Sequence, residues 1–154
     1  MKTPPARLDG IEFRAARAED YAELIALWNV ASLNVHPDGR ESELAFREQV
    51  RLFGDAYLVA REKERIVGVV LGTHDTRKGW INRLAVHPDC RRRGIAAELV
   101  RRCEAALRAR GLEIIAALVE RTNADSIRVF EAAGFNADIP VHYFRKSCGG
   151  DKSC

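Results

Sequence analysis

The sequence lacks several features that would assign it to a special class of protein. No apolar run approaches the ~20 residues that a membrane-spanning helix needs. Residues 1–10 carry two prolines and no apolar stretch, so they do not resemble a secretory signal. The four cysteines show neither metal-site spacing nor the density of a disulfide scaffold. We therefore expect a cytoplasmic protein with reduced thiols, no metal ion and no membrane segment.

The composition is that of an ordinary globular domain. The chain has 154 residues, of which 47% are hydrophobic and 31% charged, enough to bury one core. We expect a flexible leader over residues 1–10, one folded domain over 11–146 and a flexible tail over 147–154. The net charge is only +3, but eight arginines lie between positions 83 and 110. This excess indicates a polyanionic partner, either a nucleic acid or a phosphate-bearing cofactor.

The hydrophobic pattern predicts strands interleaved with helices. Strands are expected over 11–17, 57–61, 66–74, 80–86, 114–119 and 141–145, and helices around 19–31, 46–53, 95–107 and 122–133. A strand–helix–strand unit from Trp80 to Val119 predicts a parallel pair with a right-handed crossover. Because residues 114–119 are wholly apolar, we expect that strand to be buried on both faces. Thr122 and Asp125 are predicted to form a capping box for the last helix.

The helix around 95–107 is the clearest of the four. Apolar residues recur at every fourth position, at Ile95, Leu99, Cys103 and Leu107. Glu98 with Arg102, and Glu104 with Arg108, form favourable i, i+4 ion pairs on the polar face. Gly111 suits the left-handed position just beyond the end of this helix.

The turn that leads into this helix is the most informative segment. The first N–H groups of a helix have no internal partners and lie at the positive end of its dipole, so they bind anions. Gly94 and the small residues Ala96 and Ala97 would let a phosphate approach the main chain. Walker A and Rossmann turns fit worse because both require more glycines. The alternative is that Arg91 to Arg93 only form a solvated helix start.

Two motifs carry a resemblance to a known family. Arg91-x-x-Gly94-x-Ala96, which follows Leu84-Ala85-Val86-His87-Pro88, resembles the Arg/Gln-x-x-Gly-x-Gly/Ala acetyl-CoA signature of the GNAT superfamily of N-acetyltransferases. Asn123-x6-Phe130-x3-Gly134-Phe135 resembles the Asn…Tyr…Gly-Phe/Tyr segment of that family. The resemblance implies that residues 11–146 form a single α/β acetyltransferase domain. It implies a mixed sheet of about six to seven strands, helices on both faces and a splayed parallel strand pair.

The same resemblance implies which residues bind the cofactor, acetyl-CoA. The backbone of the strand ending at Val86 would pair with pantetheine amides, and one of its N–H groups would polarise the thioester carbonyl. The amides of Arg92 to Ala97 would bind the pyrophosphate, and Asn123 would contact the pantetheine arm or the thiol side. The implied cofactor-binding residues are Leu84, Ala85, Val86, Arg91, Arg92, Arg93, Gly94, Ile95, Ala96, Ala97 and Asn123.

The proton-transfer residues depart from the pattern of the family. Many members use a Glu as the general base where this chain has Asn82, and a Tyr as the general acid where it has Phe130. Neither side chain can exchange a proton, so the catalytic residues are left unassigned. Weak candidates are His74 and Asp75 at a strand end, and Asn123. His36 is a further weak candidate and Glu120 a more distant one, whereas His87 is expected to belong to the structure of the turn. A low-pKa amine would need no dedicated base.

Three functions remain open at this point. The first is transfer of an acetyl or short acyl group from acyl-CoA to a primary amine, by direct attack in a ternary complex. The second is a catalytically silent acyl-CoA-binding domain, which Asn82 and Phe130 motivate. Nucleic-acid binding ranks lowest, because the arginine cluster has no interleaved aromatic residues and no recognised reading helix. The sequence does not indicate the acceptor, and a homodimer is the assembly that the resemblance favours.

Overall fold

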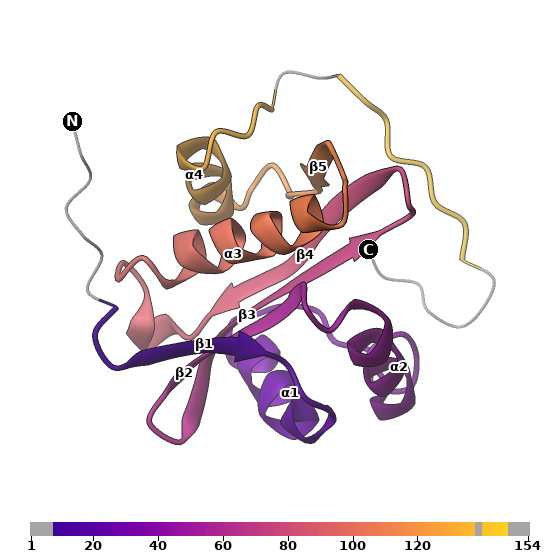
Figure 1. The fold of residues 1–154 in the computed structure, drawn as a ribbon. Helices are drawn as coiled ribbons and strands as arrows, with labels where there is room; N and C mark the ends of the chain where they lie inside the picture. Colours follow the sequence, from indigo (N-terminus) through magenta and orange to yellow (C-terminus); the bar gives the residue numbers. More distant parts are fainter. Residues whose placement is uncertain (1–7, 138–139, 148–154) are drawn as a thin grey trace.

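The computed structural model describes residues 8–137 and 140–147. Residues 1–7 of the expected leader and 148–154 of the expected tail lie outside the described residues. A five-stranded sheet in the order β1-β2-β3-β4-β5 forms the centre, with helices on both faces (Figure 1). In the described part of the chain, no helix has the length and apolar character needed to cross a membrane.

The elements alternate much as the hydrophobic pattern predicts. They are β1 (Ile11–Ala15), α1 (Tyr21–Val30), α2 (Glu43–Phe53), β2 (Tyr57–Glu62), β3 (Arg65–His74), β4 (Lys78–Val86), α3 (Ile95–Ala109), β5 (Ile114–Ala117) and α4 (Ala124–Ala132). Two short 3-10 turns, η1 (Ala18–Asp20) and η2 (Pro88–Cys90), precede α1 and α3. β1 to β4 pair in antiparallel fashion, and β4 pairs with β5 in parallel. The mixed sheet and the parallel pair are therefore confirmed.

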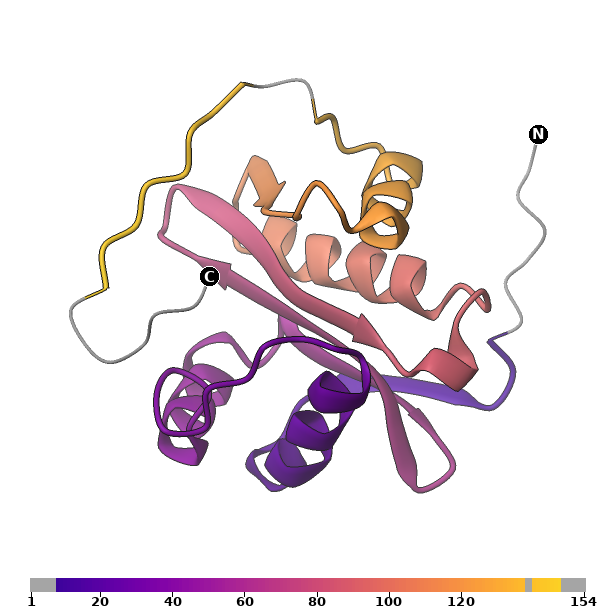
Figure 2. The same cartoon turned by 180° about the vertical axis from the view of Figure 1, so that it is seen from behind.

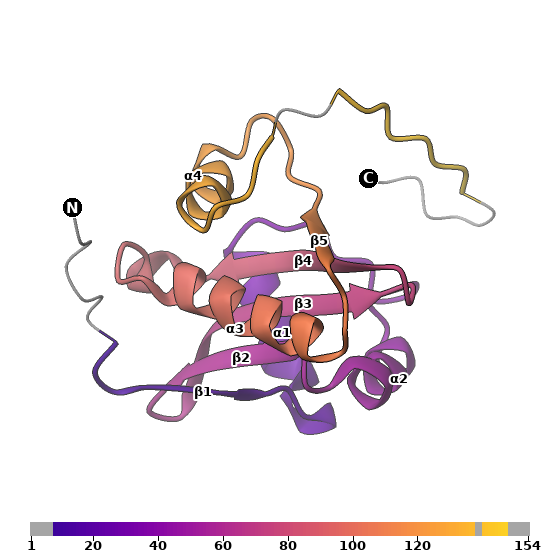
Figure 3. The ribbon, with the colours of Figure 1, turned by 45° about the horizontal axis from the view of Figure 1, so that its top comes forward.

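The helices form two separate layers over the sheet. α1 and α2 cover one face, and α3 and α4 lie on the other, as seen from behind in Figure 2 and tilted in Figure 3. In the first layer Trp28 and Phe46 are buried against Tyr57 of β2. In the second layer, the apolar stripe of α3 is fully buried against the sheet. Gly72 of β3 has no side chain, which lets α3 approach the sheet closely. A Cβ atom at Gly72 would lie only 2.6 Å from Cys103 Sγ.

The predicted details of α3 are confirmed. Arg102 Nε lies 2.7 Å from Glu98, and Arg108 Nε lies 2.8 Å from Glu104. Gly111 has φ 85°, the left-handed conformation expected just beyond the helix. These features depend on residues within one or two turns of each other, which is why the sequence pattern predicts them.

The expectation of six to seven strands is wrong, because the described residues form five. Residues 141–145, predicted as a strand, have no ladder partner in the described part of the chain. Val141, Tyr143 and Phe144 are 71%, 69% and 89% exposed, and Figure 1 shows this segment running clear of the sheet. Alternating apolar residues favour an extended chain, but only a neighbouring strand edge turns an extended segment into a strand.

The prediction that the strand at 114–119 is buried on both faces is also wrong. β5 ends at Ala117, and its residues are half-buried or exposed, with Ile114 54% exposed. The reason is its position at the edge of the sheet, where β4 is its one partner strand among the described residues. An unbroken apolar run cannot distinguish a central strand from such an edge.

Candidate functional site

The site begins with an irregularity in β4. Along the β3–β4 ladder Val69 pairs with Ala85, but Leu71 pairs with Asn82. One residue of β3 therefore faces two residues of β4, Arg83 and Leu84, which defines a β-bulge. Arg83 has φ 53°, a left-handed conformation that is uncommon for a residue with a side chain. The backbone at the bulge is thereby released from the ladder with β3.

The bulge reverses the side-chain alternation of β4. Ile81 and Leu84 both pack in the core under α3, although they are three residues apart. Regular pleating would place residues at this spacing on opposite faces of the sheet. Arg83 instead lies on the opposite face, with its guanidinium carbon 4.6 Å from the centre of the Trp28 ring.

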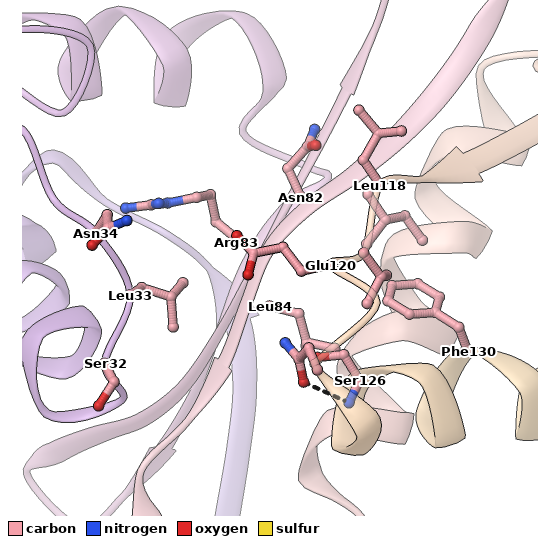
Figure 4. A pocket seen from close by; sticks show the side chains of 13 residues that line it. Ser32, Leu33, Asn34, Asn82, Arg83, Leu84, Leu118, Glu120, Ser126 and Phe130 are labelled. Carbon is pink, nitrogen blue, oxygen red and sulfur yellow. Dashed lines mark hydrogen bonds between the residues drawn. The ribbon is translucent and has the colours of Figure 1, made fainter. Parts of the chain in front are cut away.

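β4 and β5 separate immediately after they pair. Their parallel ladder covers only Lys78–Ile81 and Ile114–Ala117. Beyond it lies a pocket of about 310 Å³, which we call the cleft pocket. Its walls are the bulged part of β4, the segment 118–120 after β5 and the segment 32–34 after α1, as Figure 4 shows. The expected parallel pair is therefore present, and the cleft pocket lies beyond the end of its ladder.

A second pocket of about 720 Å³, which we call the turn pocket, lies at the start of α3. It is lined by 84–86 of β4, by Arg91 and Arg92, and by 94–97. Gly94 is the N-cap of α3 with φ 86°. Because Glu98 N makes the first helical hydrogen bond, to Gly94 O, the preceding N–H groups have no partner within the helix. The pocket thus has the main-chain donors of an anion site.

The three arginines of the turn differ in their positions. Arg91 and Arg92 line the turn pocket, and Arg91 Nε donates to Val86 O at 3.4 Å. Arg93 is not among the lining residues, and its Nη2 donates to Glu62 at 2.8 Å. This contact lowers the pKa of the Glu62 carboxyl and raises that of Arg93. The sequence pattern alone could not separate Arg93 from the other two.

Four residues line both pockets: Leu33, Leu84, Asn123 and Ser126. The two pockets therefore meet where Leu84 of β4 lies beside Asn123. Asn123 is the N-cap of α4, and its Oδ1 accepts a hydrogen bond from Ser126 N at 3.1 Å. The predicted capping box of Thr122 and Asp125 is therefore wrong by one residue. The spacing of Thr122 and Asp125 suits a capping box, but α4 begins at Ala124, one residue later than that box requires.

The two residues that replace the acid and base of the family both line the cleft pocket. Phe130 is 7% exposed, and its ring centre lies 5.2 Å from that of Phe135. Asn82 Nδ2 donates to Thr73 Oγ1 at 3.4 Å. The acidic residue among the lining residues is Glu120, whose side chain extends toward β4 in Figure 4.

His74 and Asp75 lie at the β3–β4 turn and line neither pocket. His74 Nε2 is 3.0 Å from Arg110 Nη1, and its Nδ1 accepts from Thr76 N. Asp75 accepts from the backbone N–H groups of Lys78 and Arg77, which lowers the pKa of its carboxyl. The structure does not bring this pair together with Asn123. His87 and His36 are likewise absent from the lining residues, and His87 Nδ1 accepts from Asp89 N.

Comparison with known proteins identifies the class that this fold and site define. The model of the acetyltransferase (GNAT) family matches residues 17–135, and the chain belongs to this family. It is 35% identical over 121 residues to acetyltransferase plu1384 of Photorhabdus laumondii, covering 79% of this chain and 83% of the relative. Acetyltransferase SG1711 of Sodalis glossinidius is also 35% identical over 121 residues, with 79% and 84% coverage. The chain is therefore an acyltransferase of the GNAT type.

Solved structures agree on the fold. Ard1 from Thermoplasma volcanium matches with a TM-score of 0.72 at 16% identity, over 82% of this chain and 83% of that one. AAC(6')-Iy, solved with a bisubstrate analogue, matches with a TM-score of 0.72 at 21% identity, over 90% and 99%. The yncA protein of Salmonella typhimurium, solved with its cofactor acetyl-CoA, matches with a TM-score of 0.67 at 25% identity, over 82% and 80%.

Proposed function

We propose that this protein is an N-acetyltransferase that moves an acetyl or short acyl group from acyl-CoA to a primary amine. The observation that carries the proposal is the junction of the two pockets at Leu84 and Asn123, where β4 and β5 separate. A donor in the turn pocket and an acceptor in the cleft pocket could meet there in one ternary complex. The yncA protein was solved with acetyl-CoA and AAC(6')-Iy with a bisubstrate analogue, which supports binding of both substrates by this fold.

The residues of the turn pocket fit acetyl-CoA. The bulge leaves main-chain groups near Leu84 outside the β3–β4 ladder, and these would pair with the pantetheine amides. The first turn of α3, which follows Gly94, offers free N–H groups to the pyrophosphate, with Arg91 and Arg92 beside it. We propose that residues 84–86, 91–97 and Asn123 bind this cosubstrate. Arg93 would act at the entrance of the turn pocket, because its ion pair with Glu62 holds it outside the lining residues.

Acetyl-CoA supplies an acyl group activated as a thioester. In the reaction the amine nitrogen forms a bond to the carbonyl carbon, the carbon–sulfur bond breaks, and the amine proton is transferred to solvent or to the thiolate. A main-chain N–H at the bulge would stabilise the oxyanion. Because Asn82 and Phe130 cannot exchange protons, we propose that the amine arrives neutral, without a dedicated base at those positions. His74 and Asp75 lie outside both pockets, which does not favour a role for them.

Purified protein incubated with acetyl-CoA and a panel of amines tests the proposal, with release of free thiol as the readout. We expect amine-dependent thiol release. Phe130 in the wall of the cleft pocket favours a second candidate, an acyl-CoA-binding domain without turnover. Tight binding of CoA without thiol release for any amine would support that candidate. We further propose a cytoplasmic location and, from the family resemblance, a homodimer.

A further inference from the structure

Arg83 is a cation placed in a largely buried position. Its side chain is 20% exposed, and it stacks on the ring of Trp28, which is itself 2% exposed. Burial lowers the pKa of the guanidinium, because removal of water disfavours the charged form. The group nevertheless stays protonated, as arginines do in proteins. Its charge therefore needs compensation from its surroundings.

That compensation is incomplete in the described part of the protein. The Nε and Nη2 atoms of Arg83 are buried and have no hydrogen-bond partner among the described residues. Glu41 Oε1 lies 3.7 Å from Arg83 Nη2, which is an ion pair too long for a hydrogen bond. The Glu41 carboxylate instead accepts from Arg40 Nε and from the backbone N–H of His36, each at 3.0 Å. Buried donors left unpaired are costly, so the positive charge of Arg83 is under-compensated by the described residues, although protein covers these two atoms themselves.

Arg83 belongs to the wall of the cleft pocket. In Figure 4 its side chain extends from β4 toward Asn34, whereas Glu120 approaches from the other wall. These two are the charged side chains among the residues that line this pocket. One wall therefore carries a positive charge, and the other carries a negative charge. A small molecule with a carboxylate and an amine would match both.

The charges around Arg83 favour a carboxylate over a phosphate. A guanidinium donates charge-assisted hydrogen bonds to a carboxylate. The second charge of a phosphate would be repelled by Glu41, which is 3.7 Å from Arg83, and by Glu120 across the pocket. The volume of about 310 Å³ is at the small end of ligand pockets, which suits a molecule of amino-acid size.

We propose that the acceptor is an amino acid or a similar small amine, and that Arg83 binds its carboxylate in the cleft pocket. The amine would then lie on the side of Glu120 and of the junction at Leu84 and Asn123. This inference rests on the proposed function, because it names the substrate class of the same site. Arg83 is assigned as a residue that determines specificity and takes no part in proton transfer.

The test compares acceptors that differ only in charge. Amino acids, both α and ω, are each paired with their own carboxamide, and kcat/KM is corrected for the fraction of neutral amine. The parent protein should prefer the carboxylate by about tenfold or more, the value of one or two charge-assisted hydrogen bonds. Equal use of acid and amide, or a preference for the amide, would overturn the inference. This comparison needs no variant.

Variants then assign the preference to one residue. Arg83→Gln should reduce the ratio of acid to amide to about one. Arg61→Gln is the matched control, because Arg61 is 17% exposed and paired with Glu23 at 3.6 Å, but lines neither pocket. That control should keep the preference of the parent. A ratio that persists in folded Arg83→Gln, or that disappears equally in Arg61→Gln, would contradict the assignment.

Binding measurements separate this inference from the proposed function. Calorimetry of the CoA-loaded protein with 4-aminobutyrate and with 4-aminobutyramide measures the preference without turnover. If no amine is acetylated, the proposed function fails. A binding preference for the acid that depends on Arg83 would still support the carboxylate site, and equal binding of the two compounds would overturn it.

Discussion

The side-chain oxygen of Asn123 accepts a hydrogen bond from the backbone N–H of Ser126 at 3.1 Å. This bond caps α4 and directs the amide of Asn123 to the junction of the two pockets. Asn123→Ala should lower the free energy of unfolding by about 1 kcal/mol and weaken CoA binding. Asn123→Asp should keep the cap but lose the N–H donor, so that only CoA binding weakens. Denaturant titration and calorimetry measure the two effects.

Thr122→Ala is the control for this pair of variants. Thr122 precedes the N-cap, so its removal should leave the free energy of unfolding unchanged within about 0.5 kcal/mol. If Thr122→Ala destabilised the protein as much as Asn123→Ala, the cap would be misassigned.

Gly94 tests the anion site at the start of α3. Gly94→Glu places a negative charge and a side chain at the N-cap, beside the proposed pyrophosphate position. CoA affinity should fall at least about tenfold, since charge-assisted hydrogen bonds contribute ~1.5–3 kcal/mol each. Gly111→Glu is the matched control: Gly111 has φ 85° against 86° for Gly94, and open space around its Cβ position. Similar CoA affinity in the two variants would refute the site.

Gly72 tests how closely α3 packs on the sheet. A Cβ atom there would lie 2.6 Å from Cys103 Sγ and 2.8 Å from Ala56 Cβ, both in the core. Gly72→Ala should therefore lower the free energy of unfolding by about 1–3 kcal/mol. Gly39→Ala, where the nearest atom would be 3.7 Å away, should change it little. Urea denaturation compares the two variants. Equal free energies of unfolding would show that α3 can shift to accommodate the added methyl group.

Glu98 contributes stability that depends on pH. Hydrogen bonds from Arg101 and Arg102 lower the pKa of its carboxyl to about 2 in the folded protein. A depressed folded pKa gives stability that is complete above the unfolded value, near 4.5, and lost as the pH falls toward 2. Both arginines are exposed, so we expect only about 1 kcal/mol.

Unfolding curves of the parent and of Glu98→Gln between pH 2 and 7 measure this effect. The parent should be the more stable protein near neutral pH, and the difference should vanish at the acid end. A constant difference across the range would show that Glu98 acts by packing alone.

Asn82 and Phe130 test whether the reaction proceeds without a dedicated acid or base. Asn82→Ala and Phe130→Leu should each lower turnover by less than about tenfold, whereas loss of a true acid or base costs ~10²–10⁴. The pH profile of kcat/KM, taken with two amines of different pKa, should shift with the amine. A profile that stays fixed, or a loss of a hundredfold in either variant, would reveal a proton-transfer residue.

Much of the helical side of the protein follows from the sequence alone. The apolar stripe of α3, its two ion pairs and the left-handed Gly111 depend on residues that are neighbours along one helix. The turn that we propose as the anion site is similarly local, because Gly94 and the first turn of α3 are consecutive. Helical periodicity and capping chemistry operate over one or two turns, so a linear pattern contains them.

The tertiary structure decided the features that depend on pairing between distant segments. Residues 141–145 have a strand-like pattern but meet no strand edge in the described ranges, and β5 is apolar yet lies at the edge of the sheet. The bulge that directs Arg83 to Trp28 depends on the register between β3 and β4. Register and burial are set by which segments come together, and the sequence of one segment does not contain that information. The turn that precedes α3 could therefore be predicted from the sequence, whereas the surroundings of Arg83 in the cleft pocket could not.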